Sequence, residues 1–319
     1  MLRLFIVSGH SAIDIAQGRS YRSEEVGYAQ RKSLNVLTQE QKSKYLKEGY
    51  LGLSGLVSQR WLDRLRVVTE AFVEESKALT KSDKRFDLEP SHTAEEPRIR
   101  RLNSPVDFHE EYWEFASEGP FADIAEDLLG PNFKFHHSKL NFKWSGGGEE
   151  VKWHQDIQFW PHTNYDVLTL GIYLESVTSD MAPMGIIPGS HEGPLYDQYD
   201  ESGRWTGNIR DSDLSKINAE TAEYLFGEAG TVTVHNCRSI HGSAPNLTNR
   251  IRPLLLCAYS SADALPITNL TNGGLHSEEF IRGGPAKWAR FDHRPVLMPP
   301  DWSKIGHKSI FAHQQKEGQ

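Results

Sequence analysis

The residue pattern of this chain changes character near position 133, and that change constrains the fold more than any other feature. Before it, apolar residues recur at the spacing of amphipathic helices. After it, β-branched and aromatic runs alternate with short Gly, Pro, Asn and Ser segments, as is typical of strands joined by turns. A helical block followed by many short strands favours a β-sandwich or barrel with helices packed outside it. The predicted fold is therefore mainly β with flanking helices.

Local signals place the elements of both halves. Thr38 and Gln41 form a capping-box pattern, and Gly49 fits a helix stop. Ser58 is a good N-cap for the next helix. The predicted helices are 38–49, 58–80 and 107–130, the last as one helix or two. The predicted strands are 134–144, 166–176, 184–191, 230–237 and 252–261.

Three segments lack these periods and are predicted to be irregular. Residues 81–105 are polar and contain proline, which indicates a long loop. Residues 192–215 are polar and contain glycine, which indicates a long insertion of the kind that often covers a site. The tail after residue 262 has loop character. The predicted organisation is an N-terminal arm (1–37) and a single domain (38–319) with a helical part (38–130), a β core (133–262) and a C-terminal segment (263–319).

The composition argues against some partners and locations. The formal net charge of −8 argues against nucleic acid or an anionic membrane surface as the main partner. The two cysteines, Cys237 and Cys257, fit reduced thiols in a cytosolic protein better than a disulfide framework. No apolar run approaches the length that spans a bilayer. The predicted location is the cytoplasm, and the oligomeric state is left open.

The stretch VKWHQDIQFW contains a candidate metal-binding pair, His154 and Asp156. On a strand, residues two apart point to the same face, so both side chains can reach one ion while Gln155 points away. Two histidines and one carboxylate on one face leave coordination positions open on iron(II). The alternative is a solvated polar pair on a strand, and the pair alone does not decide between them.

A third ligand has to come from a distant part of the chain. The histidines that follow are His162, His191, His235, His241, His276, His293, His307 and His313. His241 is favoured because a Gly-Ser step and a turn-forming Pro/Asn/Thr segment follow it, and Arg252 then opens an apolar strand. We expect His241 and Arg252 to lie on neighbouring antiparallel strands joined by that turn. An arginine near a metal suits a dicarboxylate, because its planar fork binds a carboxylate through two hydrogen bonds.

Together these motifs resemble the phytanoyl-CoA dioxygenase family of iron(II)/2-oxoglutarate oxygenases. The resemblance rests on His154-x-Asp156, on His241-Gly-Ser with an arginine eleven residues further on, and on the stretches WHQD and IIPGSHEG. It extends over roughly residues 133–262. It implies a double-stranded β-helix (a jelly roll, cupin-like), iron(II) as the metal, and 2-oxoglutarate and dioxygen as co-substrates.

The resemblance also implies roles for individual residues. Residues 136–160 are similar to ectoine hydroxylases within the family, and this similarity supplies the substrate contacts and one cosubstrate contact. The implied iron ligands and catalytic residues are His154, Asp156 and His241, the implied 2-oxoglutarate contacts are Arg252, Ser243 and Asn141, and the implied substrate contacts are His137, Lys139 and Trp160. For His137 and Lys139 the alternative is an exposed strand position, and for Trp160 it is the core.

Two other histidines need to be weighed against the third ligand. His235 lies six residues before His241 and is a rival ligand, although it lacks the Gly-Ser-turn-Arg context. His276 and Glu278 copy the two-apart spacing in a Gly-rich region without strand character. We interpret that pair as solvated surface.

The predicted activity is hydroxylation of an unactivated C–H bond in a small polar or natural-product-like molecule, with release of succinate and carbon dioxide. Because Asp156 fills the position that family halogenases leave open for halide, the resemblance favours hydroxylation over halogenation. Desaturation, cyclisation or epimerisation by the same chemistry remain alternatives. A noncatalytic jelly-roll binding protein and a zinc hydrolase are the rival classes, and the latter leaves Arg252 without a role.

Overall fold

The chain divides into two compact units, Met1–Ser33 and Leu34–Gln319. The computed structural model describes residues 35–146, 148–268, 274–305 and 309–314, together with three short strands of the first unit. These strands, β1 (Phe5–Ser8), β2 (Ser11–Asp14) and β3 (Arg19–Arg22), form an antiparallel sheet. The predicted boundary at residue 37 between arm and domain stays a prediction.

Four helices of the described residues lie within the three predicted helical ranges. The helices are α1 (Gln39–Glu48), α2 (Gln59–Ser76), α3 (Glu110–Glu118) and α4 (Pro120–Leu129), although α2 ends before residue 80 and α3 begins after residue 107. Thr38 and Gln41 exchange the two hydrogen bonds of a capping box, and Gly49 ends α1 in the left-handed conformation. Ser58 accepts a hydrogen bond from the backbone of Trp61 at the start of α2. The predicted helices are therefore confirmed, and the last of them is two helices.

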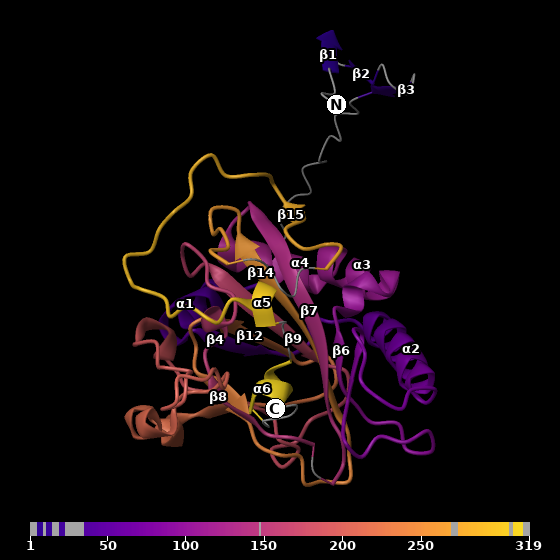
Figure 1. Cartoon of the computed structure of the whole chain (residues 1–319), viewed down its shortest axis with the longest axis vertical. Helices are drawn as coiled ribbons and strands as arrows, with labels where there is room; N and C mark the ends of the chain where they lie inside the picture. The colour runs from indigo at the N-terminus through magenta and orange to yellow at the C-terminus, as the bar shows by residue number, and fades with distance from the viewer. Residues whose placement is uncertain are drawn as a thin grey trace. The chain divides into compact units, whose positions relative to one another are not determined.

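The larger of two sheets in the second unit has eight antiparallel strands (Figure 1). In spatial order they are β4 (Tyr50–Leu53), β12 (Val232–Asn236), β9 (Val167–Tyr173), β14 (Arg252–Ser261), β7 (Phe133–Lys143), β6 (Ile99–Asn103) and β5 (Phe86–Leu88), with β15 (Phe280–Arg282) paired to β7. Strands β7, β9, β12 and β14 confirm four of the predicted strands.

The smaller sheet has four strands. In spatial order they are β11 (Glu223–Leu225), β10 (Met184–Ile186), β13 (His241–Ser243) and β8 (Val151–His154). Residues of both sheets, such as Leu254 and Met184, line one cavity, so the sheets face each other. The predicted insertion 192–215 lies between β10 and β11 and includes the start of a 3₁₀ helix. This sandwich, with its helices outside, agrees with the predicted fold class.

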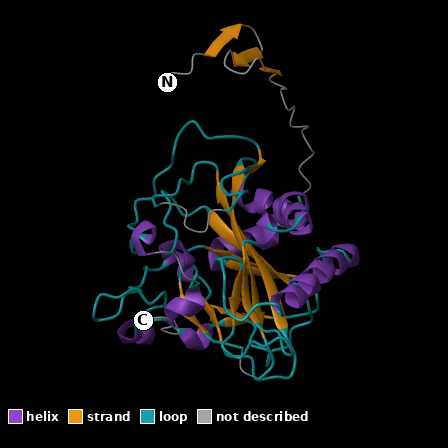
Figure 2. Cartoon of the chain, turned by 45° about the vertical axis from the view of Figure 1, so that its right-hand side comes forward, coloured by secondary structure: helices purple, strands orange, loops and turns teal. Residues whose placement is uncertain are grey.

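Strand β14 shows how one strand serves both the core and the cavity. Leu255, Cys257 and Tyr259 pack in the main hydrophobic core with residues of α2, α3 and α4. Leu254 and Leu256 point to the opposite face and line the cavity between the sheets. This division follows from the two-residue period of a strand. The helices therefore cover the outer face of the large sheet (Figure 2) and leave its inner face to the site.

Two predicted irregular segments contain regular elements. Residues 81–105 include β5 and β6, so the prediction of one long loop is wrong. Both strands are short and end the large sheet, where pairing of β6 with β7 and of β5 with β6, rather than local residue preference, specifies the extended backbone. The tail likewise contains β15, α5 (Trp302–Ile305) and α6 (Ile310–Gln314).

The loop between β5 and β6 contains a buried acidic group with a measurable effect on stability. Glu89 has an oxygen without a hydrogen-bond partner among the described residues. Burial and the nearby Glu149 raise the pKa of Glu89 from 4.5 to about 7. Because the folded pKa exceeds the unfolded one, the stabilising contribution is complete below pH 4.5 and is lost as the pH rises through about 7.

Replacing Glu89 with glutamine is therefore expected to raise the free energy of unfolding above pH 7, by on the order of 3 kcal/mol. The gain should shrink as the pH falls toward 4.5. Urea unfolding of both proteins at pH 4.5, 6 and 8 measures it. Exposed Glu95, in the same segment, provides the control, and Glu95→Gln should change stability little at every pH. An equal gain from Glu89→Gln at all pH values would contradict the assignment.

Candidate metal centre

The His154–Asp156 segment joins a strand to a 3₁₀ helix. His154 is the last residue of β8, and Asp156 is the first residue of the 3₁₀ helix that follows. Gln155 between them keeps an extended backbone, with φ −128° and ψ 119°, so the two flanking side chains still share a face. The Gln155 amide donates to the carbonyl of Arg238 at 2.9 Å and to that of Pro194 at 3.1 Å. The insertion 192–215 thus helps to hold this segment in place.

Strand pairing brings His241 to the same place. His241 begins β13 and is paired directly with His154 of β8. The two imidazole rings have centroids 4.1 Å apart. One nitrogen or oxygen atom from each of His154, Asp156 and His241 lies within 4.8 Å of the others, and all three residues are buried. The predicted trio therefore comes together.

Backbone carbonyls orient both imidazoles. Nδ1 of His154 donates to the carbonyl of Lys152 at 2.9 Å, and Nδ1 of His241 donates to that of Ser239 at 3.0 Å. The protons assigned to Nδ1 in this way leave Nε2 as the free lone pair, 3.6 Å and 3.9 Å respectively from Oδ1 of Asp156. Two nitrogens and one oxygen form a donor set that suits iron(II).

The Asp156 carboxylate has one oxygen toward the histidine pair and one held from behind. Oδ2 accepts hydrogen bonds from Thr169 and from Nε2 of His235, each at 3.3 Å. Burial would raise the pKa of Asp156, but the Lys139 ammonium and the hydrogen bond from His235 hold it well below its usual range. The carboxylate is therefore ionised, as a metal ligand must be.

His235 has a different position from a ligand. It contacts the outer oxygen of Asp156, whereas His154 and His241 face Oδ1. Burial and the neighbouring histidines lower the pKa of His241 well below its usual value, which keeps that imidazole neutral and able to donate its lone pair. The geometry favours His235 as a support for Asp156 over the rival ligand.

Arg252 reaches the same cavity from the opposite sheet. It is the first residue of β14, whereas His241 lies on β13, which pairs with β8 and β10. The expectation that the two residues occupy neighbouring paired strands is therefore wrong. The Gly-Ser-turn segment crosses from one sheet to the other instead of closing a hairpin. Arg252 is only 3% exposed, and its Nε and Nη1 atoms have no hydrogen-bond partner among the described residues.

A cavity of ≈ 50 Å³ connects Arg252 with the histidine pair. Its walls include Asn141 of β7 and Ser243 of β13, both predicted to contact 2-oxoglutarate. Asn141 accepts a hydrogen bond from Nε of Arg101 at 2.8 Å, which fixes its side-chain oxygen. The cavity thus has a buried guanidinium with two unpartnered nitrogen atoms at one end, and the candidate ligands at the other. That arrangement fits a metal-chelating dicarboxylate.

A second, smaller cavity of ≈ 30 Å³ lies on the other side of Asp156. The three predicted substrate contacts line it, and they are His137, Lys139 and Trp160. His137 and Trp160 lie with ring centroids 5.8 Å apart. Of these three, only Lys139 is more than slightly exposed, and its ammonium lies 4.0 Å from Oδ1 of Asp156. The residues therefore face the cavity and not bulk solvent.

The sequence patterns missed several residues of these walls. Arg101 and Ile310 line both cavities, Phe311 lines the first and Phe159 the second. Burial lowers the pKa of Arg101 to about 10, so the guanidinium stays protonated at neutral pH. Arg101 lies in the segment predicted to be a loop, and Ile310 and Phe311 lie in α6 of the tail. The available signal is only Ile99 and Leu102 on either side of two arginines, which has no strand period and is too short to identify a strand.

The pair of His276 and Glu278 is separate from this centre. The His276 ring stacks on Trp113 with centroids 3.7 Å apart and bonds to Glu279. Glu278 pairs with Lys134. These contacts hold the C-terminal segment against α3 and β7.

The fold and the site together define a class. A jelly roll with two histidines and one aspartate on one face, and a buried arginine across the cavity, is the arrangement of a non-haem iron(II) oxygenase. The family model for phytanoyl-CoA dioxygenase (PhyH) matches residues 45–254, and the chain belongs to that family. The chain is a 2-oxoglutarate-dependent oxygenase that uses iron(II), which confirms the predicted family, fold class and cofactors.

Named relatives give the scale of the similarity. A probable alpha-ketoglutarate-dependent hypophosphite dioxygenase of Stutzerimonas stutzeri is 30% identical over 278 residues, covering 86% of this chain and 96% of the relative. The ectoine dioxygenase of Bordetella bronchiseptica is 23% identical and covers 76% and 81%. The crystal structure of EctD from S. alaskensis with bound Fe has a TM-score of 0.62 at 22% identity, covering 82% and 89%. The relatives named here are enzymes of small molecules.

Within the described ranges, no helix combines the length and the apolar character that crossing a bilayer requires.

Proposed function

We propose that this protein hydroxylates a small polar molecule, with His154, Asp156 and His241 as the iron ligands. Arg252 binds the distal carboxylate of 2-oxoglutarate. The observation that carries this assignment is the unpaired Nε and Nη1 of Arg252, buried in the same cavity as the histidines. The Tyr173 side chain bonds to this guanidinium, but the two buried nitrogen atoms that lack an acceptor are costly unless a ligand supplies one. A zinc hydrolase would leave this arginine without a function.

The overall reaction balances with one substrate hydrogen replaced by hydroxyl. One oxygen atom of dioxygen enters the substrate and the other enters succinate, and the C1 carboxyl of 2-oxoglutarate leaves as carbon dioxide. Substrate and 2-oxoglutarate are each oxidised by two electrons, and dioxygen accepts all four. Bound iron(II) supplies the site at which dioxygen is activated.

The side chains of the protein bind and orient the cosubstrate and the substrate, and they exclude water. Arg252 binds the far carboxylate through its planar fork, which fixes the cosubstrate along the cavity. Asn141 and Ser243 contact its flanks. Phe159 and Ile310 restrict the access of water to the substrate side. Exclusion of water there prevents side reactions during oxidation of the substrate. His137, Lys139 and Trp160 contact the substrate.

The test is metal and cosubstrate binding followed by turnover. Protein purified without oxygen should bind one iron(II) and, with 2-oxoglutarate, develop the visible iron–oxoglutarate charge-transfer band. Oxygen should then release succinate, and a true substrate should accelerate that release. Hypophosphite, named in one relative, is the first compound to test. Tight zinc with hydrolytic activity and no band would support the hydrolase, and iron binding without succinate would support a noncatalytic module.

The cytoplasm is the proposed location. Both cysteines are free and buried, which suits a reducing compartment.

A further inference from the structure

Two cations meet where the cosubstrate and substrate cavities join. Arg101 and Lys139 line both cavities and come from adjacent strands, β6 and β7. Arg101 is 6% exposed, and the Lys139 side chain is 17% exposed. Both charges are therefore directed into the interior and not into solvent.

Neither cation has a carboxylate of its own among the described residues. Arg101 donates to the amide oxygen of Asn141 and lies over the Phe311 ring, 5.3 Å from its centroid. Lys139 has only Asp156, at 4.0 Å, and that carboxylate is a proposed iron ligand. The neighbouring Arg100 is different, because it pairs with Asp87 at 2.8 Å and Glu149 at 3.0 Å.

The loaded site leaves neither cation with a carboxylate bonded to it, and Asp87 acts on Arg101 only through space. The positive charges of iron(II) and Arg252 are balanced by the negative charges of Asp156 and the 2-oxoglutarate dianion. Arg101 and Lys139 then remain as buried cations in a small cavity. An uncompensated buried ion is costly even after relaxation of its surroundings. A ligand that brings negative charge would remove that cost, whereas a neutral or cationic ligand would not.

The walls limit the size of that ligand. The substrate-side cavity measures ≈ 30 Å³ and is the smaller of the two cavities that Arg101 and Lys139 line. Phe159, Trp160 and Ile310 form its apolar side. Phe311 of α6 is 1% exposed and closes the cosubstrate-side cavity. A compact anion fits this enclosure, and a long acyl chain does not.

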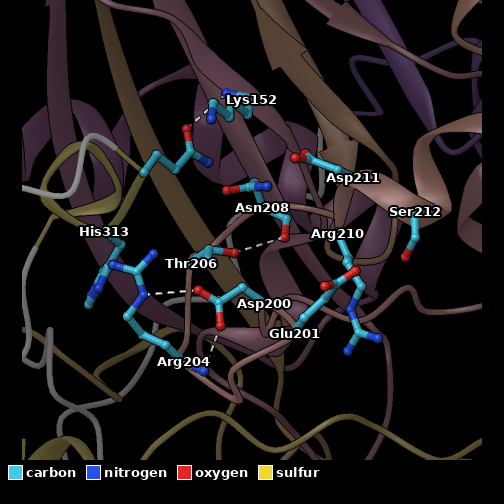
Figure 3. A pocket seen from close by; sticks show the side chains of 11 residues that line it. Lys152, Asp200, Glu201, Arg204, Thr206, Asn208, Arg210, Asp211, Ser212 and His313 are labelled. Carbon is cyan, nitrogen blue, oxygen red and sulfur yellow. Dashed lines mark hydrogen bonds and ion pairs between the residues drawn. The ribbon is translucent and has the colours of Figure 1, made fainter.

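A larger hollow elsewhere on the chain does not contain arginines that need an anionic ligand. It has a volume of ≈ 230 Å³ and is lined by charged residues of the insertion and of α6 (Figure 3). Its two arginines are already paired, because Arg204 bonds to Asp200 at 3.0 Å and Arg210 bonds to Asp197. This hollow therefore provides a control site.

We infer that the substrate is a compact oxyanion, a phosphinate, phosphonate or short carboxylate, which Arg101 and Lys139 bind together beside the iron ligands. The inference rests on the proposed function and narrows its substrate class. The hydrogen that is replaced lies on the phosphorus or carbon next to the anionic group. The electron and atom balance is that given above for hydroxylation.

The test is equilibrium binding to the anaerobic iron–2-oxoglutarate complex. Calorimetric titrations compare hypophosphite, methylphosphonate and propionate with the neutral dimethyl methylphosphonate and propionamide. We expect at least one anion to bind and to accelerate succinate release, and the neutral compounds to do neither. The anion that binds most tightly identifies phosphorus or carbon as the centre of the substrate.

Variants assign the binding to the two cations. Arg101→Gln and Lys139→Gln should each weaken binding of that anion roughly 30-fold or more. Arg101→Lys, which keeps the charge, should recover part of the affinity. Arg204→Gln in the control hollow should bind it as the unmodified protein does. The charge-transfer band of each variant reports that the cosubstrate site is intact.

The outcomes separate this inference from the proposed function. Turnover with a neutral compound, no binding by any of the anions, or unchanged anion affinity in both glutamine variants would overturn the oxyanion assignment, while the charge-transfer band kept the oxygenase assignment standing. Absence of the band and of succinate in the unmodified protein would overturn both.

Discussion

Replacing Asp156 with alanine is expected to abolish iron(II) binding at micromolar metal and to lower succinate formation roughly 1000-fold or more. Changes to groups that merely support a ligand cost 10- to 100-fold, and loss of the ligand itself should exceed that range. The substitution removes the oxygen that lies 3.6 Å and 3.9 Å from the two histidine nitrogens. It also leaves Lys139 without its nearest carboxylate. Metal content after anaerobic dialysis and the charge-transfer band measure the loss.

Two further variants calibrate this result. Thr169→Val removes a hydrogen bond to the outer oxygen of Asp156 and should weaken iron binding about 10- to 100-fold. Asp180→Ala removes an exposed aspartate and should leave iron binding unchanged. Undiminished iron affinity and turnover in Asp156→Ala would reject the assignment of the metal site.

Arg252→Ala is expected to weaken 2-oxoglutarate binding by roughly 30-fold to a few thousandfold, because truncating one partner of a buried charge pair costs about 2–5 kcal/mol. Iron binding should persist, since Arg252 lies across the cavity on the other sheet. Titration of 2-oxoglutarate into the anaerobic iron protein, followed at the charge-transfer band, gives the dissociation constant directly. Arg252→Lys should recover only part of the affinity, because an ammonium lacks the planar fork.

The chain provides a matched control two residues away. Arg250 is exposed and donates to the carbonyl of Ser176, outside the cavity. Arg250→Ala should therefore bind 2-oxoglutarate as tightly as the unmodified protein. If Arg252→Ala lost iron together with 2-oxoglutarate, Arg252 would be a structural support of the metal site and not a cosubstrate contact.

Prediction of the fold succeeded where the information is local. Thr38 and Ser58 cap their helices through hydrogen bonds to residues three positions away, so sequence spacing alone contains the signal. The long strands β7 and β14 can be identified from the three phenylalanines of the first and the apolar run of the second. Strands β5 and β6 are short and charged, and their structure depends on pairing at the sheet edge. Residues 81–105 were therefore assigned to a loop.

The candidate site divides in the same way. His154 and Asp156 were predictable because a single extended residue separates them. His241 was placed through its motif, but its pairing with His154 across β8 and β13 depends on strand register. Arg101 and Ile310 had no motif, since each reaches the cavities only through the packing of segments far apart in the chain.

The sequence by itself determined the class of protein, the four helices and the residue types able to hold iron and a dicarboxylate, since spacing along the chain encodes local geometry. Only the tertiary structure decided that Arg252 faces the histidines from the opposite sheet, and that Arg101, Lys139 and α6 enclose the substrate side. The physical reason is that cavities form between layers. The charge and the volume of a cavity depend on side chains from segments that are far apart in the sequence. A local sequence pattern therefore cannot predict them.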